Sequence, residues 1–227
     1  MIRVTENLNQ VRERLQNAAR VAGREPSEIK LLAVSKRHSV ASIEAVAGAG
    51  QRDFGENFVT EGLGKIEALA ARELCWHFIG AIQSNKTRDI AAHYDWVHTV
   101  ERLKIARRLS EQRPDDRPPL DVCLQVNVDD EPQKAGVRPA QAAELAEQVA
   151  RLPRLRLRGL MCLPRVRTSP EAQREPFSAL RQLLEALQPQ HATLDTLSMG
   201  MTGDLEAAVL EGATIVRVGT AIFGPRD

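Results

Sequence analysis

The sequence is poor in the features that mark secreted, metal-binding and membrane proteins. Its 227 residues include only three cysteines, Cys75, Cys123 and Cys162, and none of them has C-x-x-C spacing. This argues against a disulfide framework and a cysteine zinc site, and it is typical of a reducing cytoplasm. No segment approaches the ~20 apolar residues of a membrane span, and the N-terminus lacks the apolar stretch of a signal peptide. We therefore expect a soluble, cytoplasmic protein.

Net charge and lysine are also scarce. The formal net charge is +1, which gives no whole-chain electrostatic reason to bind nucleic acid or an anionic membrane. The histidines show no metal-ligand spacing, so we expect no metal site. Of the 31 basic residues, 25 are arginines and 6 are lysines, and the position of each lysine is therefore more informative than usual.

Strand-like and helix-like segments alternate along the chain. The pattern predicts eight short strands, at residues 31–34, 53–55, 76–79, 96–99, 121–126, 157–161, 193–197 and 215–218. Helical stretches separate them, with clear three-four spacing of apolar residues at 39–49, 101–111, 139–151 and 171–187. A further helix opens the chain, with Thr5 as its expected N-cap and Gly23 as its expected end.

Eight such βα units in a chain of this length predict a closed (β/α)8 TIM barrel, a single domain over residues 1–227. This fold typically has ~250 residues and tolerates ~200. The alternative is an open doubly wound sheet, which usually carries G-x-G-x-x-G after its first strand, whereas Ser35-Lys36-Arg37-His38 stands there. Little chain follows the eighth strand, so we expect the extra N-terminal helix to take the place of the last helix.

Lys36 lies at the carboxyl end of the first expected strand, where barrels place their functional residues. A lysine held partly out of water there loses its charge more easily and can attack a carbonyl as an amine nucleophile. Lys36 alone does not separate this role from that of a solvated loop lysine. The other expected strand ends converge on the same face: Glu56-Asn57, Gly80, Asn127, Ser198-Met199-Gly200 and Gly219-Thr220.

Two glycine-containing loops near the C-terminus predict a phosphate site. Residues 198–204 (SMGMTGD) lead into an expected helix at 205–211 with Thr202 as its N-cap, and residues 218–221 form a second glycine turn. Glycines let backbone N–H groups approach an anion closely, and barrels commonly bind phosphate between the loops after strands seven and eight. In the alternative interpretation these glycines are ordinary turn residues.

Arg217 is an unusual residue for a strand in a barrel. Val216 and Val218 share one face and should meet the outer helices, so Arg217 points into the barrel near its top. A buried guanidinium needs a partner, either a structural carboxylate such as Glu56 or a ligand atom that accepts a hydrogen bond, such as a pyridine nitrogen. His77 lies in an aromatic strand, and we expect a hydrogen-bonded core histidine rather than a catalytic one.

These segments closely resemble the pyridoxal-phosphate homeostasis protein family, stand-alone barrels related to the N-terminal domain of alanine racemase. The resemblance is carried by residues 33–36 (AVSK), 54–57 (FGEN), 77–80 (HFIG) with 83–86 (QSNK), 197–201 (LSMGM) with Asp204, and 216–224 (VRVGTAIFG). Thr202 stands where the family usually has serine, and Phe58 and Thr60 vary the segment after Asn57.

The resemblance implies that Lys36 holds pyridoxal 5′-phosphate (PLP) as a Schiff base. It further implies that Ser198, Gly219 and Thr220 hold the phosphate, that Arg217 faces the pyridine nitrogen, that Asn57 lines the pocket, and that Met199 and Gly200 belong to the cofactor-binding residues. The implied function is PLP homeostasis: a non-catalytic protein, expected to be a monomer, that binds the cofactor reversibly and supplies it. Apo-forms of PLP-dependent enzymes would be its transient partners.

An amino-acid racemase is the main alternative function. An arginine at the pyridine nitrogen discourages ring protonation and makes PLP a poorer electron sink. Alanine racemase compensates with a catalytic tyrosine and a second domain, whereas the single tyrosine here, Tyr94, is expected before strand four at the amino-terminal side of the barrel. A Schiff-base aldolase is a third possibility, disfavoured because its lysine would be expected on a later strand.

Overall fold

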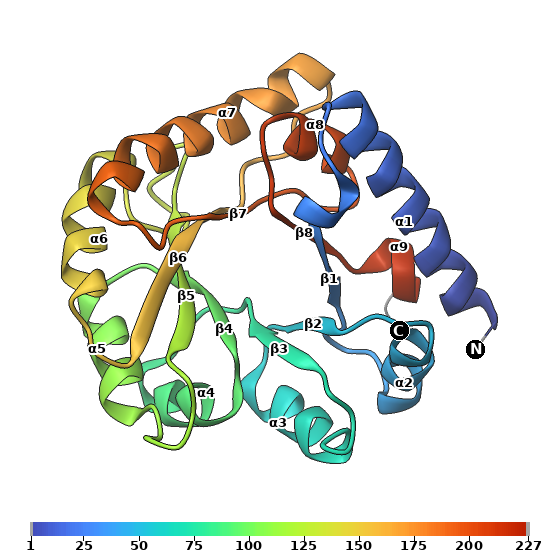
Figure 1. Ribbon diagram of the computed structural model, residues 1–227, viewed down its shortest axis with the longest axis horizontal. Coiled ribbons are helices and arrows are strands. Elements are labelled where there is room, and N and C mark those ends of the chain that lie inside the picture. The colour runs from blue at the N-terminus through green and yellow to red at the C-terminus, as the bar shows by residue number, and fades with distance from the viewer. Residues whose placement is uncertain (1, 226–227) are drawn as a thin grey trace.

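The computed structural model describes residues 2–225, in which eight parallel strands close into a barrel surrounded by helices (Figure 1). Each strand pairs with the next along the chain, and β8 returns to pair with β1. The strands are β1 (Lys30–Val34), β2 (Asp53–Glu56), β3 (Cys75–Phe78), β4 (Trp96–Val100), β5 (Leu120–Val126), β6 (Leu155–Cys162), β7 (Thr196–Ser198) and β8 (Ile215–Val218). The predicted (β/α)8 TIM barrel is therefore confirmed.

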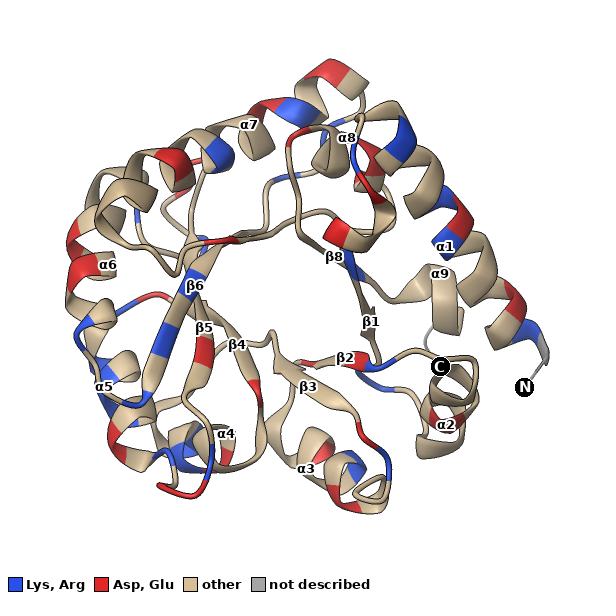
Figure 2. Ribbon diagram, in the orientation of Figure 1, with Lys and Arg blue, Asp and Glu red and all other residues tan. Residues whose placement is uncertain are grey.

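Helices cover the outside of the barrel (Figure 1). The α-helices are α1 (Ile2–Val21), α2 (Val40–Gly48), α3 (Val59–Ala68), α4 (Thr87–His93), α5 (Leu103–Gln112), α6 (Ala142–Ala150), α7 (Pro170–Leu187), α8 (Leu205–Leu210) and α9 (Thr220–Phe223). Short 3-10 turns are η1 (Pro26–Glu28), η2 (Ser84–Lys86), η3 (Pro139–Gln141) and η4 (Gln188–Gln190). Charges of both signs are spread along the outer helices (Figure 2), in keeping with the small net charge.

The N-terminal helix completes the outer ring. α1 packs against α2, α8 and α9, so it takes the place beside the last strand as predicted (Figure 1). Gly23 follows it with a φ of +66°, a left-handed conformation that suits glycine at a helix end. The prediction of Thr5 as N-cap was wrong. α1 begins at Ile2, one turn earlier. The side chain of Val4 packs against the core, and this apolar contact stabilises the first turn of the helix.

All eight predicted strands are present in the structure, and their ends differ from the predicted ends by a few residues. β7 begins at Thr196 rather than Thr193 because residues 192–193 form a turn, and the Thr193 hydroxyl donates to the Leu157 carbonyl at 2.6 Å. The main apolar core lies between the strands and the helices. A smaller cluster fills the inside of the barrel: Leu32, Trp96, Cys123, Met161 and Ile215.

Candidate functional site

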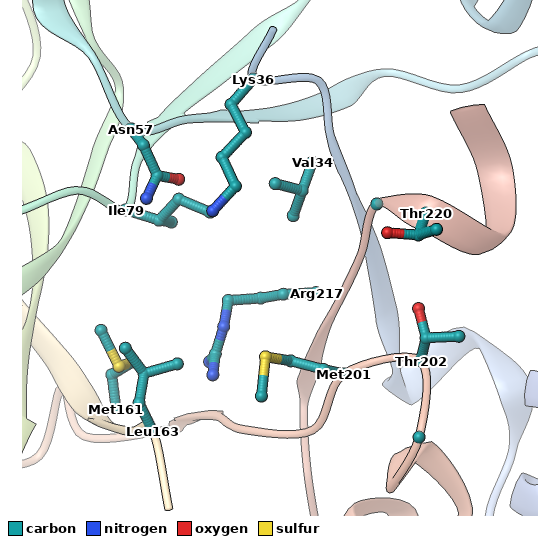
Figure 3. A pocket seen from close by; sticks show the side chains of 12 residues that line it. Val34, Lys36, Asn57, Ile79, Met161, Leu163, Met201, Thr202, Arg217 and Thr220 are labelled. Carbon is teal, nitrogen blue, oxygen red and sulfur yellow. The ribbon is translucent and has the colours of Figure 1, made fainter. Parts of the chain in front are cut away.

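A cavity of about 300 Å³ opens at the carboxyl ends of the strands (Figure 3). It is lined by Val34, Lys36, Asn57, Ile79, Met161, Leu163, Met201, Thr202, Gly203, Arg217, Gly219 and Thr220. Figure 3 shows the Lys36 amine pointing into this cavity towards the Arg217 guanidinium. Thr202 and Thr220 lie close to one another on the other side. This is the end of a barrel at which binding and catalytic sites form.

Buried polar groups hold the backbone just before Lys36. Ser35 is fully buried, and its hydroxyl donates to Glu56 Oε1 at 2.6 Å. Lys65 Nζ, from α3, donates to Glu56 Oε1 at 2.8 Å and to the Ser35 carbonyl at 2.7 Å. Burial raises the pKa of Glu56, and the hydrogen bonds from Lys65 and Ser35 oppose this rise. The position of Lys36 is thus set by an ion pair outside the cavity.

The backbone just after Lys36 is tied to the same network. Arg37 adopts a left-handed φ of +63°, which turns the chain sharply at the end of β1. Its backbone N–H donates to Glu61 Oε1, which also accepts from Lys65. Lys36 is therefore anchored on both sides, and its long side chain starts from a defined point at the cavity wall.

Asn57 follows β2 and enters the cavity beside Lys36. The backbone of Asn57 lies directly against Gly80, which follows β3. This contact requires a glycine, because a Cβ atom at Gly80 would lie only 2.0 Å from the Asn57 carbonyl oxygen. Among the described residues, the buried Asn57 Oδ1 has no hydrogen-bond partner. A buried polar atom without a partner is costly in a protein interior, and it is expected where a ligand supplies the missing donor.

The loops after β7 and β8 form the opposite wall. Gly219 precedes α9, and the first N–H groups of a helix have no partner within the helix. A Cβ atom at Gly219 would lie 3.2 Å from the Val34 carbonyl oxygen, so the glycine lets β8 and β1 approach at this level. The prediction of Thr202 as the N-cap of α8 was wrong. Asp204 occupies that position, and its carboxylate accepts from the Met201 N–H at 2.6 Å, which folds the loop so that Thr202 lines the cavity.

Arg217 points into the barrel, as the alternation along β8 predicted. Its Nη1 donates to Ser198 Oγ at 2.7 Å and its Nη2 donates to the Cys162 carbonyl at 2.8 Å. The guanidinium is buried among neutral partners, and burial lowers its pKa. Glu56, one of the two alternative partners that the sequence left open for Arg217, is not its partner, because Glu56 pairs with Lys65.

Five of the eight sequence-predicted site residues line the cavity: Lys36, Asn57, Arg217, Gly219 and Thr220. The other three lie behind its wall. Ser198 is buried beneath Arg217, and Met199 packs in the core outside the strands. Gly200, with a φ of +90°, forms a turn in which a Cβ atom would lie 2.5 Å from the Ala208 Cβ atom. These three remain predictions as cofactor contacts.

Several lining residues were missed from the sequence. Met161 and Leu163 lie at the end of β6, and the convergence of strand ends on one face of a barrel is the signal that predicts them. Gly203 was considered only as part of a glycine turn. Tyr94 lies where it was expected, just before β4, buried against Phe78 and outside the cavity lining. Within the described residues, every helix is too short or too polar to cross a bilayer.

Comparisons with known proteins agree with this geometry. Residues 7–227 match the model of the family described as alanine racemase, N-terminal domain. The chain is 56% identical over 227 residues to the pyridoxal phosphate homeostasis protein of Pseudomonas aeruginosa, covering 100% of this chain and 97% of that protein. It is 50% identical over 231 residues to the protein of the same name from Escherichia coli, covering 99% and 97%.

Solved structures show the same architecture. PipY of Synechococcus elongatus with PLP bound has a TM-score of 0.84 and 35% identity, covering 97% of this chain and 100% of that chain. An alanine racemase of Clostridium difficile has a TM-score of 0.78 at 14% identity, which shows a shared fold alone. Fold and site thus define a barrel of the alanine racemase N-terminal type with a lysine at the end of its first strand. The chain belongs to the pyridoxal phosphate homeostasis protein family, which confirms the resemblance noted in the sequence.

Proposed function

We propose that this chain binds PLP reversibly through Lys36 and serves in the homeostasis and supply of the cofactor, not in catalysis. The observation that carries the proposal is the convergence of the Lys36 amine and the Arg217 guanidinium in one cavity (Figure 3). Homologues named for PLP homeostasis, and the PLP bound to PipY, support it.

The cavity offers a suitable group to each part of PLP. The Lys36 amine can condense with the aldehyde to a Schiff base, with release of water. Arg217 has N–H donors for the pyridine nitrogen, and the loops containing Thr202 and Thr220 offer hydroxyls and backbone N–H groups to the phosphate. The unpartnered Asn57 Oδ1 fits a polar ligand in the cavity. The residues present therefore fit the cofactor.

The same residues are poorly suited to catalysis. PLP supplies an electron sink for carbanions, and this sink is stronger when the ring nitrogen is protonated. A guanidinium can only donate hydrogen bonds, so Arg217 favours an unprotonated ring nitrogen. In the described part of the chain, Lys36 and Arg217 are the only ionisable residues among those that line the cavity. The single tyrosine, Tyr94, is not among them.

Further parts of the proposal concern the whole protein. We propose one domain over residues 1–227, a monomer in the cytoplasm, and transient transfer of PLP to apo-forms of PLP-dependent enzymes. An amino-acid racemase is the alternative function.

Reduction of the loaded protein with borohydride tests the covalent link. The treatment fixes a Schiff base as a stable pyridoxyl-lysine, which peptide mass mapping locates. We expect the adduct on Lys36, its loss in Lys36→Met, and its retention in Lys104→Met, a variant of an exposed lysine on α5. An adduct on another lysine, with Lys36 unmodified, would contradict the proposal.

A further inference from the structure

A line of hydrogen-bonded side chains runs along the inside of the barrel from one end to the other. At the cavity end, Arg217 Nη1 lies 2.7 Å from Ser198 Oγ. Ser198 Oγ lies 2.7 Å from His98 Nδ1, and His98 Nε2 lies 2.9 Å from His77 Nδ1. The line ends at Asp53, whose Oδ1 lies 3.0 Å from His77 Nε2. We call these five residues the polar column.

The ionised carboxylate of Asp53 and two neutral imidazoles together set the direction of every hydrogen bond in the polar column. A guanidinium can only donate and an ionised carboxylate can only accept. A neutral His77 therefore donates its Nε2–H to Asp53, and its Nδ1 accepts from the Nε2–H of His98. The Nδ1 of a neutral His98 then accepts the hydrogen of the Ser198 hydroxyl, whose oxygen accepts from Arg217. Each contact has one donor and one acceptor, with both imidazoles neutral.

The electrostatic setting agrees with these protonation states. His77 and His98 are fully buried, and burial lowers the pKa of both imidazoles, that of His98 well below its ordinary value. Burial alone would raise the pKa of Asp53, but the hydrogen bonds that it accepts from His77 and Lys30, together with the charge of Lys30, keep this pKa below its usual value. Neutral imidazoles above an ionised carboxylate are therefore the expected state.

The end of the polar column at Asp53, which we call its foot, reaches the surface at the amino-terminal end of the strands. Asp53 is the first residue of β2, and its carboxylate is 2.7 Å from the ammonium of Lys30, which is 38% exposed. Asp53, Cys75 and His77 place potential metal-ligating atoms within 4.8 Å of one another, but the Lys30 ammonium opposes a cation there. The foot is thus an ion pair linked by hydrogen bonds to the cavity.

We propose that Asp53, His77, His98 and Ser198 are positioning residues, which hold the Arg217 side chain in the orientation that it presents to the cavity. A buried guanidinium needs acceptors, and the polar column keeps Ser198 Oγ as an acceptor because the hydroxyl hydrogen is committed to His98. The remaining N–H groups of Arg217 are then left for a ligand. The identity of that ligand rests on the proposed function, whereas the hold on Arg217 exists without it.

Nitrogen-15 NMR of histidine-labelled protein without PLP tests the polar column directly. In the wild-type protein we expect a protonated Nε2 and an unprotonated Nδ1 on both His77 and His98. Asp53→Ala removes the last acceptor, and the signals of His98, which is two hydrogen bonds away, should shift. Asp121→Ala is the matched control, because Asp121 also lies at the amino-terminal end of the barrel but pairs with arginines of β6. It should leave the His98 signals unchanged.

Ser198→Ala cuts the polar column at its other end and provides an independent variant should Asp53→Ala fail to fold. It removes the donor to His98 Nδ1, so the His98 signals should shift here too. A proton on Nδ1 of either histidine in the wild-type protein, or unchanged His98 signals in the folded variants, would overturn the proposed column.

Equilibrium titration with PLP tests the positioning role. We expect Asp53→Ala to weaken PLP binding about fivefold, the effect of roughly one hydrogen bond, with a shifted absorbance maximum of the bound cofactor. Asp121→Ala should stay within about twofold of the wild-type affinity. Suppose that Asp53→Ala alters the His98 signals and still binds PLP with the affinity and absorbance spectrum of the wild-type protein. That result would refute the positioning role. If the wild-type protein bound no PLP, the proposed function would be wrong. The NMR experiment would still show whether the hydrogen bonds of the polar column exist.

Discussion

Lys65 Nζ lies 2.7 Å from the carbonyl oxygen of Ser35, so a side chain of α3 holds the backbone directly before Lys36. The same ammonium is 2.8 Å from Glu56 Oε1, and both side chains are almost completely buried. A buried ion pair seldom adds much stability compared with apolar residues, but breaking one is expensive. The role of the Lys65–Glu56 ion pair is to fix the backbone position from which the Lys36 side chain starts.

Lys65→Met should therefore reduce both stability and PLP binding. The substitution leaves the Glu56 carboxylate buried without its cation, and we expect a loss of about 3–5 kcal/mol in the free energy of unfolding. Urea denaturation measures this loss. Lys104→Met, which removes an exposed lysine, should change the free energy by no more than about 0.5 kcal/mol. A cost below about 1 kcal/mol for Lys65→Met would contradict the structural role of the pair.

A double variant separates the charge effect from the packing effect. In Lys65→Met with Glu56→Gln, the buried side chain at position 56 is neutral and still accepts from the Ser35 hydroxyl. Part of the lost free energy of unfolding should return, because the uncompensated charge is gone. No recovery would mean that the methionine itself disturbs the packing of α3 against β2.

Much of the site could be predicted from the sequence because strand ends in a barrel converge on one face. The apolar run before Lys36 and the alternating valines around Arg217 placed both side chains correctly. The partner of Arg217 could not be predicted from the sequence. Glu56, the expected carboxylate, forms an ion pair with Lys65 of α3, and a buried lysine on a helix is unexpected. His77 was correctly expected to be a hydrogen-bonded core histidine. Its partners come from other strands, and their register is not evident in the sequence.

The two residues at the start of α9 should differ in their effect on PLP binding. Thr220→Ala removes one hydroxyl and leaves the backbone N–H groups in place, so affinity should fall by about 0.5–1.5 kcal/mol. Gly219→Val should do far more damage, because the position next to the Val34 carbonyl has little room beyond a Cβ atom and the branched side chain would crowd the cavity wall. Equilibrium titration with PLP measures both effects. A harmless Gly219→Val would mean that the phosphate is held elsewhere.

Stability should fall as the pH drops below 6.5. Burial holds the pKa of His77 and His98 below 6.5, so the unfolded chain takes up protons there that the folded protein does not. Because the unfolded state binds more protons, the free energy of unfolding decreases with falling pH, by up to about 1.4 kcal/mol per histidine for each pH unit. Above pH 6.5 this contribution is fully present. Urea denaturation at several pH values measures the slope.

Two variants identify the groups behind this slope. His98→Phe should flatten it, since one titrating imidazole is lost, whereas His93→Gln, on the exposed end of α4, should keep it. The raised pKa of Glu56 acts in the opposite sense, because stability from a protonated carboxyl is lost as the pH rises. Both variants retain Glu56, so its contribution cancels in the comparison. An unchanged slope in His98→Phe would exclude His98 as a source.

The loaded protein should not remove the α-proton of an amino acid at an enzymatic rate. Arg217 disfavours the protonated pyridine ring, and of the described lining residues only Lys36 and Arg217 can ionise, so a carbanion would lack both a strong electron sink and a paired acid and base. Proton NMR of L-alanine in deuterated water makes the exchange visible. We expect no faster loss of the α-proton signal with the loaded protein than with free PLP. Rapid deuterium incorporation that disappears in Lys36→Ala would show that the protein is a catalyst and that the homeostasis function is wrong.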